Sequence, residues 1–208
     1  MSIDEQRARE FCAERVDDRA IAALERMAVL LRDENQHQNL VSAASLDHVW
    51  QRHYADSLQL LDHVPRGTEH WLDLGSGAGF PGLVLAVARP EEHFVLVESR
   101  KRRAEWLTRA AAALRLNNCN IAALRLEVLP DFAADVITAR AFAPLPRLLA
   151  LASRFSTPDS VWLLPKGRSA AQELAEQPAD VRSMFHVEPS WTDPSGGILI
   201  GKGAPAVR

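Results

Sequence analysis

Apolar residues recur at helical spacing through the N-terminal part of the chain and predict a helix over residues 4–33. The polar residues 34–45 follow as a loop, and Ser45 is placed to cap a second helix over 46–63. Pro65 and Gly67 end that second helix. The apolar positions of the two predicted helices are Phe11, Val16, Ile21, Leu24, Met27, Leu30, Leu31, Val49, Trp50, Leu58 and Leu61.

The pattern changes after Gly67, where short apolar runs alternate with amphipathic stretches. We predict strands at 70–74, 93–98, 120–126, 134–141 and 160–167, and helices at 81–90, 101–116, 145–155 and 169–177. The runs at 184–189 and 196–203 predict a closing hairpin. This alternation is typical of an α/β fold with a mostly parallel, seven-stranded sheet and helices on both faces. We therefore divide the chain into an N-terminal helical extension, 1–66, and a sheet domain, 67–208.

Ligands of such sheets bind beyond the carboxyl ends of the strands. Five predicted strands end at polar or glycine-rich positions, which should meet around one crevice. These positions are Asp73–Phe80, Glu98, Leu126–Glu127, Arg140 and Lys166.

The stretch LDLGSGAGFPG, residues 72–82, fits two glycine templates. The dinucleotide fingerprint G-x-G-x-x-G would use Gly77, Gly79 and Gly82, but the first glycine after the strand is Gly75, so that fingerprint is out of register. Pro81 removes an amide donor from the following helix, and Asp73 would repel a pyrophosphate but not a cation. We therefore predict a ligand without phosphates, and we assign Gly82 to close packing between helix and strand.

Glu98 ends the second predicted strand, 23 residues after Gly75. An acidic side chain at this position is placed to accept hydrogen bonds from the ribose hydroxyls of an adenosine cofactor. The alternative is an exposed carboxylate that pairs with Lys101 or Arg102.

The composition is that of an ordinary globular protein, with 47% apolar and 25% charged residues. The opening residues lack the pattern of a signal peptide, and no apolar run is long enough to span a membrane, so we expect a cytoplasmic protein. Cys12 and Cys119 match no metal or disulfide framework. We expect no metal site, and a monomer.

Basic residues gather between Arg100 and Arg154, where ten Arg or Lys stand against four acids although the net charge of the chain is −3. This segment indicates a face that contacts phosphates, and the alternative is a set of solvated helix surfaces. The run RKRR at 100–103 lies at a helix start, where cations oppose the helix dipole. If it contacts RNA, changing Lys101, Arg102 and Arg103 to Ala should flatten the salt dependence of binding.

Several motifs occur together in a fixed order: NLVS, RHYADSL, LDLGSGAGFPGLVLA, LVESRKRRAEWL, RLE, TARAFAPL and LLPKG, between Asn39 and Gly167. In these motifs the chain resembles the bacterial small-subunit ribosomal RNA methyltransferase G family, also called glucose-inhibited division protein B. The resemblance implies a Rossmann-like, class I methyltransferase that uses S-adenosylmethionine (SAM) to methylate N7 of one guanine in 16S rRNA. The partner is then 16S rRNA or the small ribosomal subunit.

The resemblance also implies site residues. By position, Gly75, Phe80, Leu126, Glu127 and Arg140 would contact the cofactor, with Leu126 and Glu127 near its adenine or ribose. Arg140 would also lie at the point of methyl transfer. To these we add three residues from the strand-end argument, namely Asp73, Gly77 and Glu98. The chain departs from the family pattern in its glycine-rich tail, GGILIGKGAPAVR.

Guanine N7 carries a lone pair and no proton, so its methylation needs positioning rather than a general base. Accordingly we expect no nucleophilic His, Ser or Cys. Arg140 is the candidate catalytic residue, holding guanine through O6 or binding a flanking phosphate, and the alternative is an ion pair with Glu127 or Asp73. Lys166 is a second candidate contact with base or phosphate. We assign His53 to the core or an interface, with an active-site role as the alternative.

Phe80 lies in the loop tip, where we expect an aromatic ring to stand outside the core, whereas Trp50, Trp106 and Trp162 are assigned to the core. The sequence leaves three competing functions: a small-molecule methyltransferase, a nicotinamide-dependent oxidoreductase and a non-catalytic SAM-binding module. The basic segment argues against the first. Asp73, Pro81 and the glycine register argue against the second.

Overall fold

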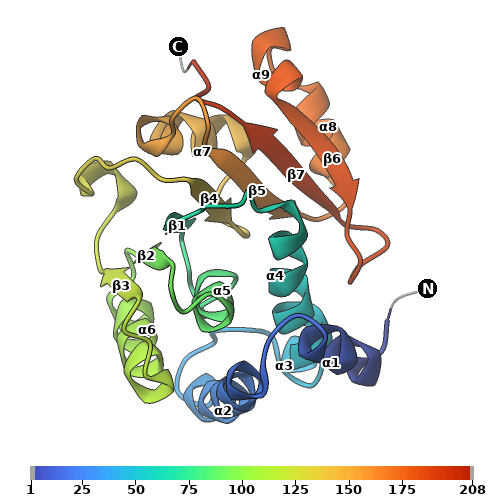
Figure 1. Ribbon diagram of the computed structural model, residues 1–208, viewed down its shortest axis with the longest axis vertical. Helices are drawn as coiled ribbons and strands as arrows, with labels where there is room; N and C mark the ends of the chain where they lie inside the picture. The colour runs from blue at the N-terminus through green and yellow to red at the C-terminus, as the bar shows by residue number, and fades with distance from the viewer. Residues whose placement is uncertain (1–2, 207–208) are drawn as a thin grey trace.

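The computed structural model describes residues 3–206; residues 1–2 and 207–208, the outermost ends of the two predicted segments, lie outside the described residues. Its centre is a seven-stranded sheet of order β3-β2-β1-β4-β5-β7-β6 (Figure 1). The strands are β1 (His70–Leu74), β2 (His93–Val97), β3 (Cys119–Ala122), β4 (Val136–Ala139), β5 (Val161–Lys166), β6 (Phe185–Pro189) and β7 (Gly197–Lys202). The first five are parallel, and β7 pairs antiparallel with both β5 and β6. The predicted sheet and closing hairpin are confirmed.

The largest differences from the predicted strands are at β3 and β4, which are each at least three residues shorter than predicted. The chain leaves the sheet after Ala122, and Leu126–Val128 forms a 3-10 turn (η3) instead of continuing β3. Leu126 is nevertheless buried, so its apolar side chain serves the core from a turn. The strand predicted at 134–141 is β4, Val136–Ala139.

Consecutive strand residues point to opposite faces of the sheet. Both faces carry apolar side chains, and helices cover both. Trp71 of β1 and Phe94 of β2 stack in the core cluster that contains α5 (Gly82–Ala88) and α6 (Lys101–Leu114). Leu72 and Leu74 of β1 enter the second cluster. That second face is covered by α7 (Leu145–Ala152), η4 (Ser153–Phe155), α8 (Ala170–Ala175) and α9 (Ala179–Met184). The short helix α9 was not predicted.

The N-terminal residues form two helices rather than one, so that prediction was wrong. They are α1 (Glu5–Ala13) and α2 (Asp18–Asn35). Asp17 ends the continuity because its carboxylate accepts a hydrogen bond from the amide of Ala20, 2.8 Å away, which caps α2.

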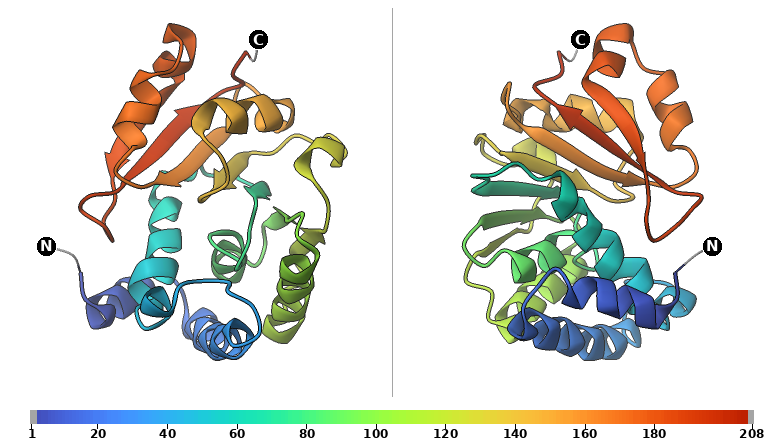
Figure 2. Two further views of the ribbon diagram at one scale, coloured as in Figure 1. Left: turned by 180° about the vertical axis from the view of Figure 1, so that it is seen from behind. Right: turned by 45° about the vertical axis from the view of Figure 1, so that its right-hand side comes forward.

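The helix predicted at 46–63 is also divided, into a π-helix η1 (Trp50–Ala55), α4 (Asp56–Leu58) and a 3-10 helix η2 (Gln59–His63). A separate short helix, α3 (Ala43–Leu46), forms in the predicted loop before it, and its N-cap is Ser42 and not Ser45. The Tyr54 hydroxyl donates to the carbonyl of Leu24 at 2.9 Å, which joins η1 to α2. The N-terminal helices share one core cluster with α5 and α6, and Figure 2 shows them on that side of the molecule, away from α8 and α9. The boundary at residue 66 stays a prediction.

Among residues 3–206, no helix combines the length and apolar character that crossing a membrane requires.

Candidate active site

Two cavities lie side by side at the carboxyl ends of the strands and share one wall. We call them the glycine-loop pocket, about 510 Å³, and the Lys166 pocket, about 560 Å³. The shared wall is the segment Ala141, Phe142, Ala143 and Pro144, which follows β4. Ala141 has a φ of +53°, a left-handed conformation that costs about 1–2 kcal/mol for a residue with a Cβ atom. The strand ends therefore make two compartments and not the single crevice that we expected.

The glycine-loop pocket contains four of the predicted cofactor residues, Gly75, Glu98, Leu126 and Glu127. Gly75 has a φ of +66°, and a Cβ atom there would lie 2.6 Å from the ring of Phe142. Only glycine lets the backbone pass beneath this ring. The loop thus presents bare backbone to the cavity, which fits a ligand that approaches closely.

Glu98 is buried, and its two carboxylate oxygens organise the loops on either side of it. Oε2 accepts a hydrogen bond from the amide of Gly77 at 3.1 Å, and Oε1 accepts one from the amide of Arg100 at 2.7 Å. The alternative, an ion pair between Glu98 and Lys101 or Arg102, was wrong. Lys101 pairs with Glu105, and Arg102 donates to the carbonyl of His37. Each carboxylate oxygen keeps a second lone pair for a ligand.

Asp73 lies behind the loop and does not line either pocket. Its carboxylate is 1% exposed and accepts hydrogen bonds from the Thr138 hydroxyl at 2.8 Å and from the amide of Gly82 at 3.2 Å. Burial raises the pKa of Asp73, against the opposing effect of these hydrogen bonds. A Cβ atom on Gly82 would lie 2.5 Å from Asp73 Oδ2, so the assignment of Gly82 to close packing is confirmed. The carboxylate ties β1, β4 and α5 together.

Leu126 and Glu127 form the far wall of the glycine-loop pocket, on η3. Leu126 is buried, whereas Glu127 is exposed and pairs with Arg125 at 2.7 Å. The hydrogen bond from Arg125 lowers the pKa of Glu127. One apolar and one charged side chain thus stand next to each other at this end of the cavity.

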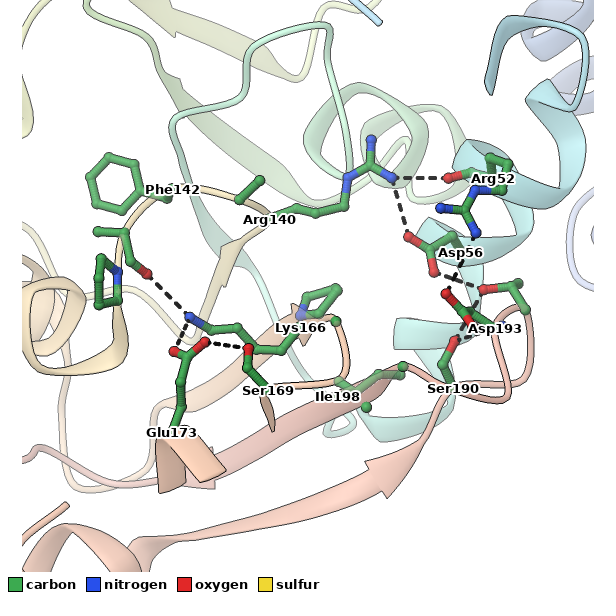
Figure 3. Close-up of a pocket in the computed structure, with 18 residues that line it drawn as sticks. Arg52, Asp56, Arg140, Phe142, Lys166, Ser169, Glu173, Ser190, Asp193 and Ile198 are labelled. Atoms are coloured by element: carbon green, nitrogen blue, oxygen red, sulfur yellow. Dashed lines mark hydrogen bonds and ion pairs between the residues drawn. The ribbon is translucent and has the colours of Figure 1, made fainter. Parts of the chain in front are cut away.

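Arg140 directly follows β4 and lines the Lys166 pocket, not the glycine-loop pocket. Its ion pair is neither of those that we weighed, since Nη1 lies 3.2 Å from Asp56 Oδ2. Nη1 also donates to the carbonyl of Arg52 at 3.0 Å, and Nη2 lies 3.0 Å from His53 Nδ1. Figure 3 shows Arg140 and Asp56 on one side of the pocket.

Lys166 and Glu173 form the opposite side of the same pocket (Figure 3). Lys166 Nζ lies 2.8 Å from Glu173 Oε2 and 3.1 Å from the carbonyl of Ala143 in the shared wall. Burial alone would raise the pKa of Glu173, but the hydrogen bonds from Lys166 and Ser169 outweigh it and lower that pKa. Two charged pairs therefore face each other across the cavity.

Phe80 corrects one expectation: its ring is 3% exposed and belongs to the core. It stacks on the ring of His53, with centroids 4.4 Å apart and planes 6° from parallel, and the Arg140 guanidinium lies 5.1 Å from its centre. The loop tip is covered because η1 packs over it, a tertiary contact that the loop sequence does not encode. His53 is buried, as its assignment to the core required, yet it also touches Arg140.

A family model described as rRNA small subunit methyltransferase G matches residues 20–191. A relative of that name from Erythrobacter litoralis is 56% identical over 203 residues, covering 98% of this chain and 98% of the relative. The chain belongs to this family. A second methyltransferase G, from Novosphingobium aromaticivorans, is 52% identical over 190 residues, covering 90% of this chain and 82% of that one. The family consists of SAM-dependent enzymes, which confirms the predicted family, enzyme class and cofactor.

Solved structures agree on the fold. A complex of MtNAS with S-adenosylmethionine aligns with a TM-score of 0.54 at 17% identity, over 83% of this chain and 72% of that one. The ribosomal protein L11 methylase of Lactobacillus delbrueckii aligns with a TM-score of 0.53 at 15% identity, over 72% of this chain and 77% of that one. At this identity the likeness supports the predicted class I methyltransferase fold and nothing finer.

The sequence did not point to four residues of this candidate site: Asp56, Thr138, Phe142 and Glu173. The first three lie inside motifs that carried the resemblance, RHYADSL and TARAFAPL, so the motifs were the available signal. Glu173 lies in an ordinary amphipathic stretch that gave none. The described residues contain no cluster of three or more side chains able to hold a metal ion.

Proposed function

We propose that this protein transfers the methyl group of SAM to N7 of a specific guanine in 16S rRNA, with the cofactor in the glycine-loop pocket and the guanine in the Lys166 pocket. The observation that carries the proposal is the shared wall 141–144, across which the two cavities meet. Both cavities have the size of small-molecule sites. A methyl donor and an acceptor base bound in them would lie next to each other.

The residues of the glycine-loop pocket fit the cofactor. Glu98 is placed for the ribose hydroxyls, Leu126 and Glu127 for the adenine end, and Gly75 for the part nearest the shared wall. Gly77 and Asp73 act on the cofactor through the loop that they hold. Phe80 does not line the pocket and supports the site indirectly, through its stack on His53 and its contact with Arg140. When bound, SAM supplies an electrophilic methyl group.

This reaction does not require removal of a proton from the nucleophile, because guanine N7 carries a free lone pair and no proton. Catalysis therefore depends on positioning. Positioning alone supplies about 7–11 kcal/mol in favourable cases. The charged side chains of the Lys166 pocket are held in place by ion pairs. Arg140 pairs with Asp56, and Lys166 pairs with Glu173. Arg140 is the residue we assign to the substrate, where its planar fork suits O6 of guanine or a flanking phosphate.

Four arginines at the mouth of the glycine-loop pocket support RNA as the substrate: Arg100, Arg103, Arg125 and Arg147. Arg100, Arg125 and Arg147 are exposed, and Arg103 is half-buried. SAM itself is a cation at its sulfonium, so this basic rim is better matched to a polyanion that covers the mouth.

The test is methyl transfer from labelled SAM to small ribosomal subunits, to naked 16S rRNA and to a panel of small nucleophiles, followed by mapping of the modified base. We expect label at N7 of one guanine in 16S rRNA, and loss of that label for Arg140→Ala with the fold intact. Label on a small nucleophile only, or at another atom of the RNA, would overturn the proposal. Full activity of Arg140→Ala would remove Arg140 from the mechanism.

A further inference from the structure

The Arg140 guanidinium is held by three acceptors that come from one short stretch, residues 52–56. They are the carbonyl of Arg52 at 3.0 Å, His53 Nδ1 at 3.0 Å and Asp56 Oδ2 at 3.2 Å. A guanidinium has five N–H groups in a rigid fork, so these bonds fix its plane and leave two N–H groups for a ligand. The stretch includes the end of the π-helix η1, a rare conformation that occurs often at functional sites.

His53 is locked in one orientation and one tautomer. Its ring lies flat on Phe80, and a guanidinium only donates, so Nδ1 must accept and the proton must reside on Nε2. Nε2 is buried and has no hydrogen-bond partner within residues 3–206. The contact with Arg140 therefore orients the ring, and the Nε2–H group stays without a hydrogen bond, which is unfavourable for a buried donor. Burial, with Arg140 and Arg52 nearby, lowers the pKa of His53 to about 3, which keeps Nδ1 an acceptor at neutral pH.

Asp56 is fixed from its other side by the loop between β6 and β7. Its Oδ1 accepts from the Thr192 hydroxyl at 2.8 Å and from Gln59 Nε2 at 3.0 Å. The amide of Trp191 in turn donates to Gln59 Oε1 at 2.9 Å. The loop between β6 and β7, which precedes the glycine-rich tail, thus contacts the carboxylate that holds Arg140.

We infer that His53 and Asp56 are positioning residues that orient Arg140 for methyl transfer, and that the N-terminal helices and the β6–β7 loop serve the reaction through them. The inference rests on the proposed function. Two residues outside the sheet, His53 and Asp56, would then hold the Arg140 guanidinium in one plane. The family motifs alone do not give them this role.

The experiment compares variants that separate the acceptor from the ring. His53→Phe keeps the stack on Phe80 and removes the acceptor, whereas His53→Asn returns an amide oxygen close to the position of Nδ1. Asp56→Asn weakens the ion pair. The exposed neighbours His48 and Asp47 provide matched controls, as His48→Phe and Asp47→Asn.

We expect kcat to fall at least tenfold for His53→Phe and Asp56→Asn, with KM for SAM unchanged within about threefold. His53→Asn should recover much of the loss, and both controls should behave as wild type. Wild-type kcat in His53→Phe or in Asp56→Asn would overturn the inference, as would a loss of kcat that His53→Asn does not relieve at all.

A second readout does not depend on methyl transfer. The ¹⁵N shifts of the His53 ring in the wild type should report a neutral Nε2–H tautomer at pH 6–8, and a mixture of tautomers or a titrating ring in Arg140→Ala. An Nδ1–H tautomer in the wild type would overturn the inference even if His53→Phe fails to fold. If the wild type methylates no guanine, the proposed function fails, and the ring shifts still decide whether Arg140 and His53 are bound as described.

Discussion

Replacing Asp73 separates two roles that a carboxylate in the glycine loop can have. From the sequence we predicted a charge that faces the ligand, whereas Asp73 is buried and its oxygens accept hydrogen bonds from Thr138 and Gly82. Asp73→Ala removes both acceptors and leaves the Gly82 amide and the Thr138 hydroxyl unpaired in the core. At about 1–3 kcal/mol for each buried unpaired group, the free energy of unfolding should fall by about 2–6 kcal/mol.

Asp73→Asn should be far milder. Its amide oxygen accepts from the Gly82 amide, and its NH2 group donates to the Thr138 hydroxyl, which rotates to accept. Burial disfavours the charged form of Asp73, so removing that charge also offsets part of any loss. The free energy of unfolding should therefore change by less than about 1 kcal/mol, the size of one net hydrogen bond.

The assay pairs urea unfolding with calorimetric titration of SAM. We expect Asp73→Asn to bind SAM within about threefold of wild type, a difference of roughly 0.6 kcal/mol. Ser160→Ala, which removes a buried hydroxyl bonded to Ala134 and lies outside both pockets, controls for loss of stability alone. If Asp73→Asn folds normally but binds SAM more than about tenfold weaker, the charge itself acts on the cofactor and the account of Asp73 as a loop anchor is wrong.

Two other predictions concern pH and salt. The pKa of His53 is about 3 in the folded protein and near 6.5 when unfolded, so only the unfolded chain takes up this proton as pH falls below 6.5. Wild type should lose stability relative to His53→Phe by up to about 1.4 kcal/mol per pH unit between pH 6 and 4; parallel urea curves would refute this. Changing Lys101 and Arg102 to Ala should lower the slope of log K for RNA against log salt by about 0.7–0.9 for each phosphate that the variant no longer neutralises, whereas Arg19→Ala with Arg26→Ala on α2 should not. Equal slopes in the two pairs would assign the run at 100–103 to solvated surface.

The parts of the fold that repeat a local rule were predictable from the sequence. Apolar runs placed the strands, and Glu98 was found because an acidic residue after the second strand has a recurrent geometry. The gap between α1 and α2 was missed because a continuous apolar stripe hid the cap at Asp17. A local cap needs only one side chain, and it overrode the periodicity.

The site was harder to predict where distant segments meet. Phe80 is in the core only because η1 covers it, and Arg140 finds Asp56 rather than Glu127 for the same reason. No spacing rule relates residue 140 to residue 56. Residues 141–144 divide the strand-end crevice into two pockets, and their path depends on the left-handed conformation of Ala141. The amino-acid sequence gives no sign of that conformation, because alanine rarely adopts it.

The central claim is that cofactor and substrate lie in adjacent cavities on either side of residues 141–144. A crystal structure of the protein soaked with S-adenosylhomocysteine, the demethylated product, tests it most directly. We expect the ribose on Glu98, the adenine beside Leu126 and Glu127, and the sulfur directed at the shared wall, with the Lys166 pocket left open for the base. S-adenosylhomocysteine bound between Arg140 and Lys166 would contradict the account.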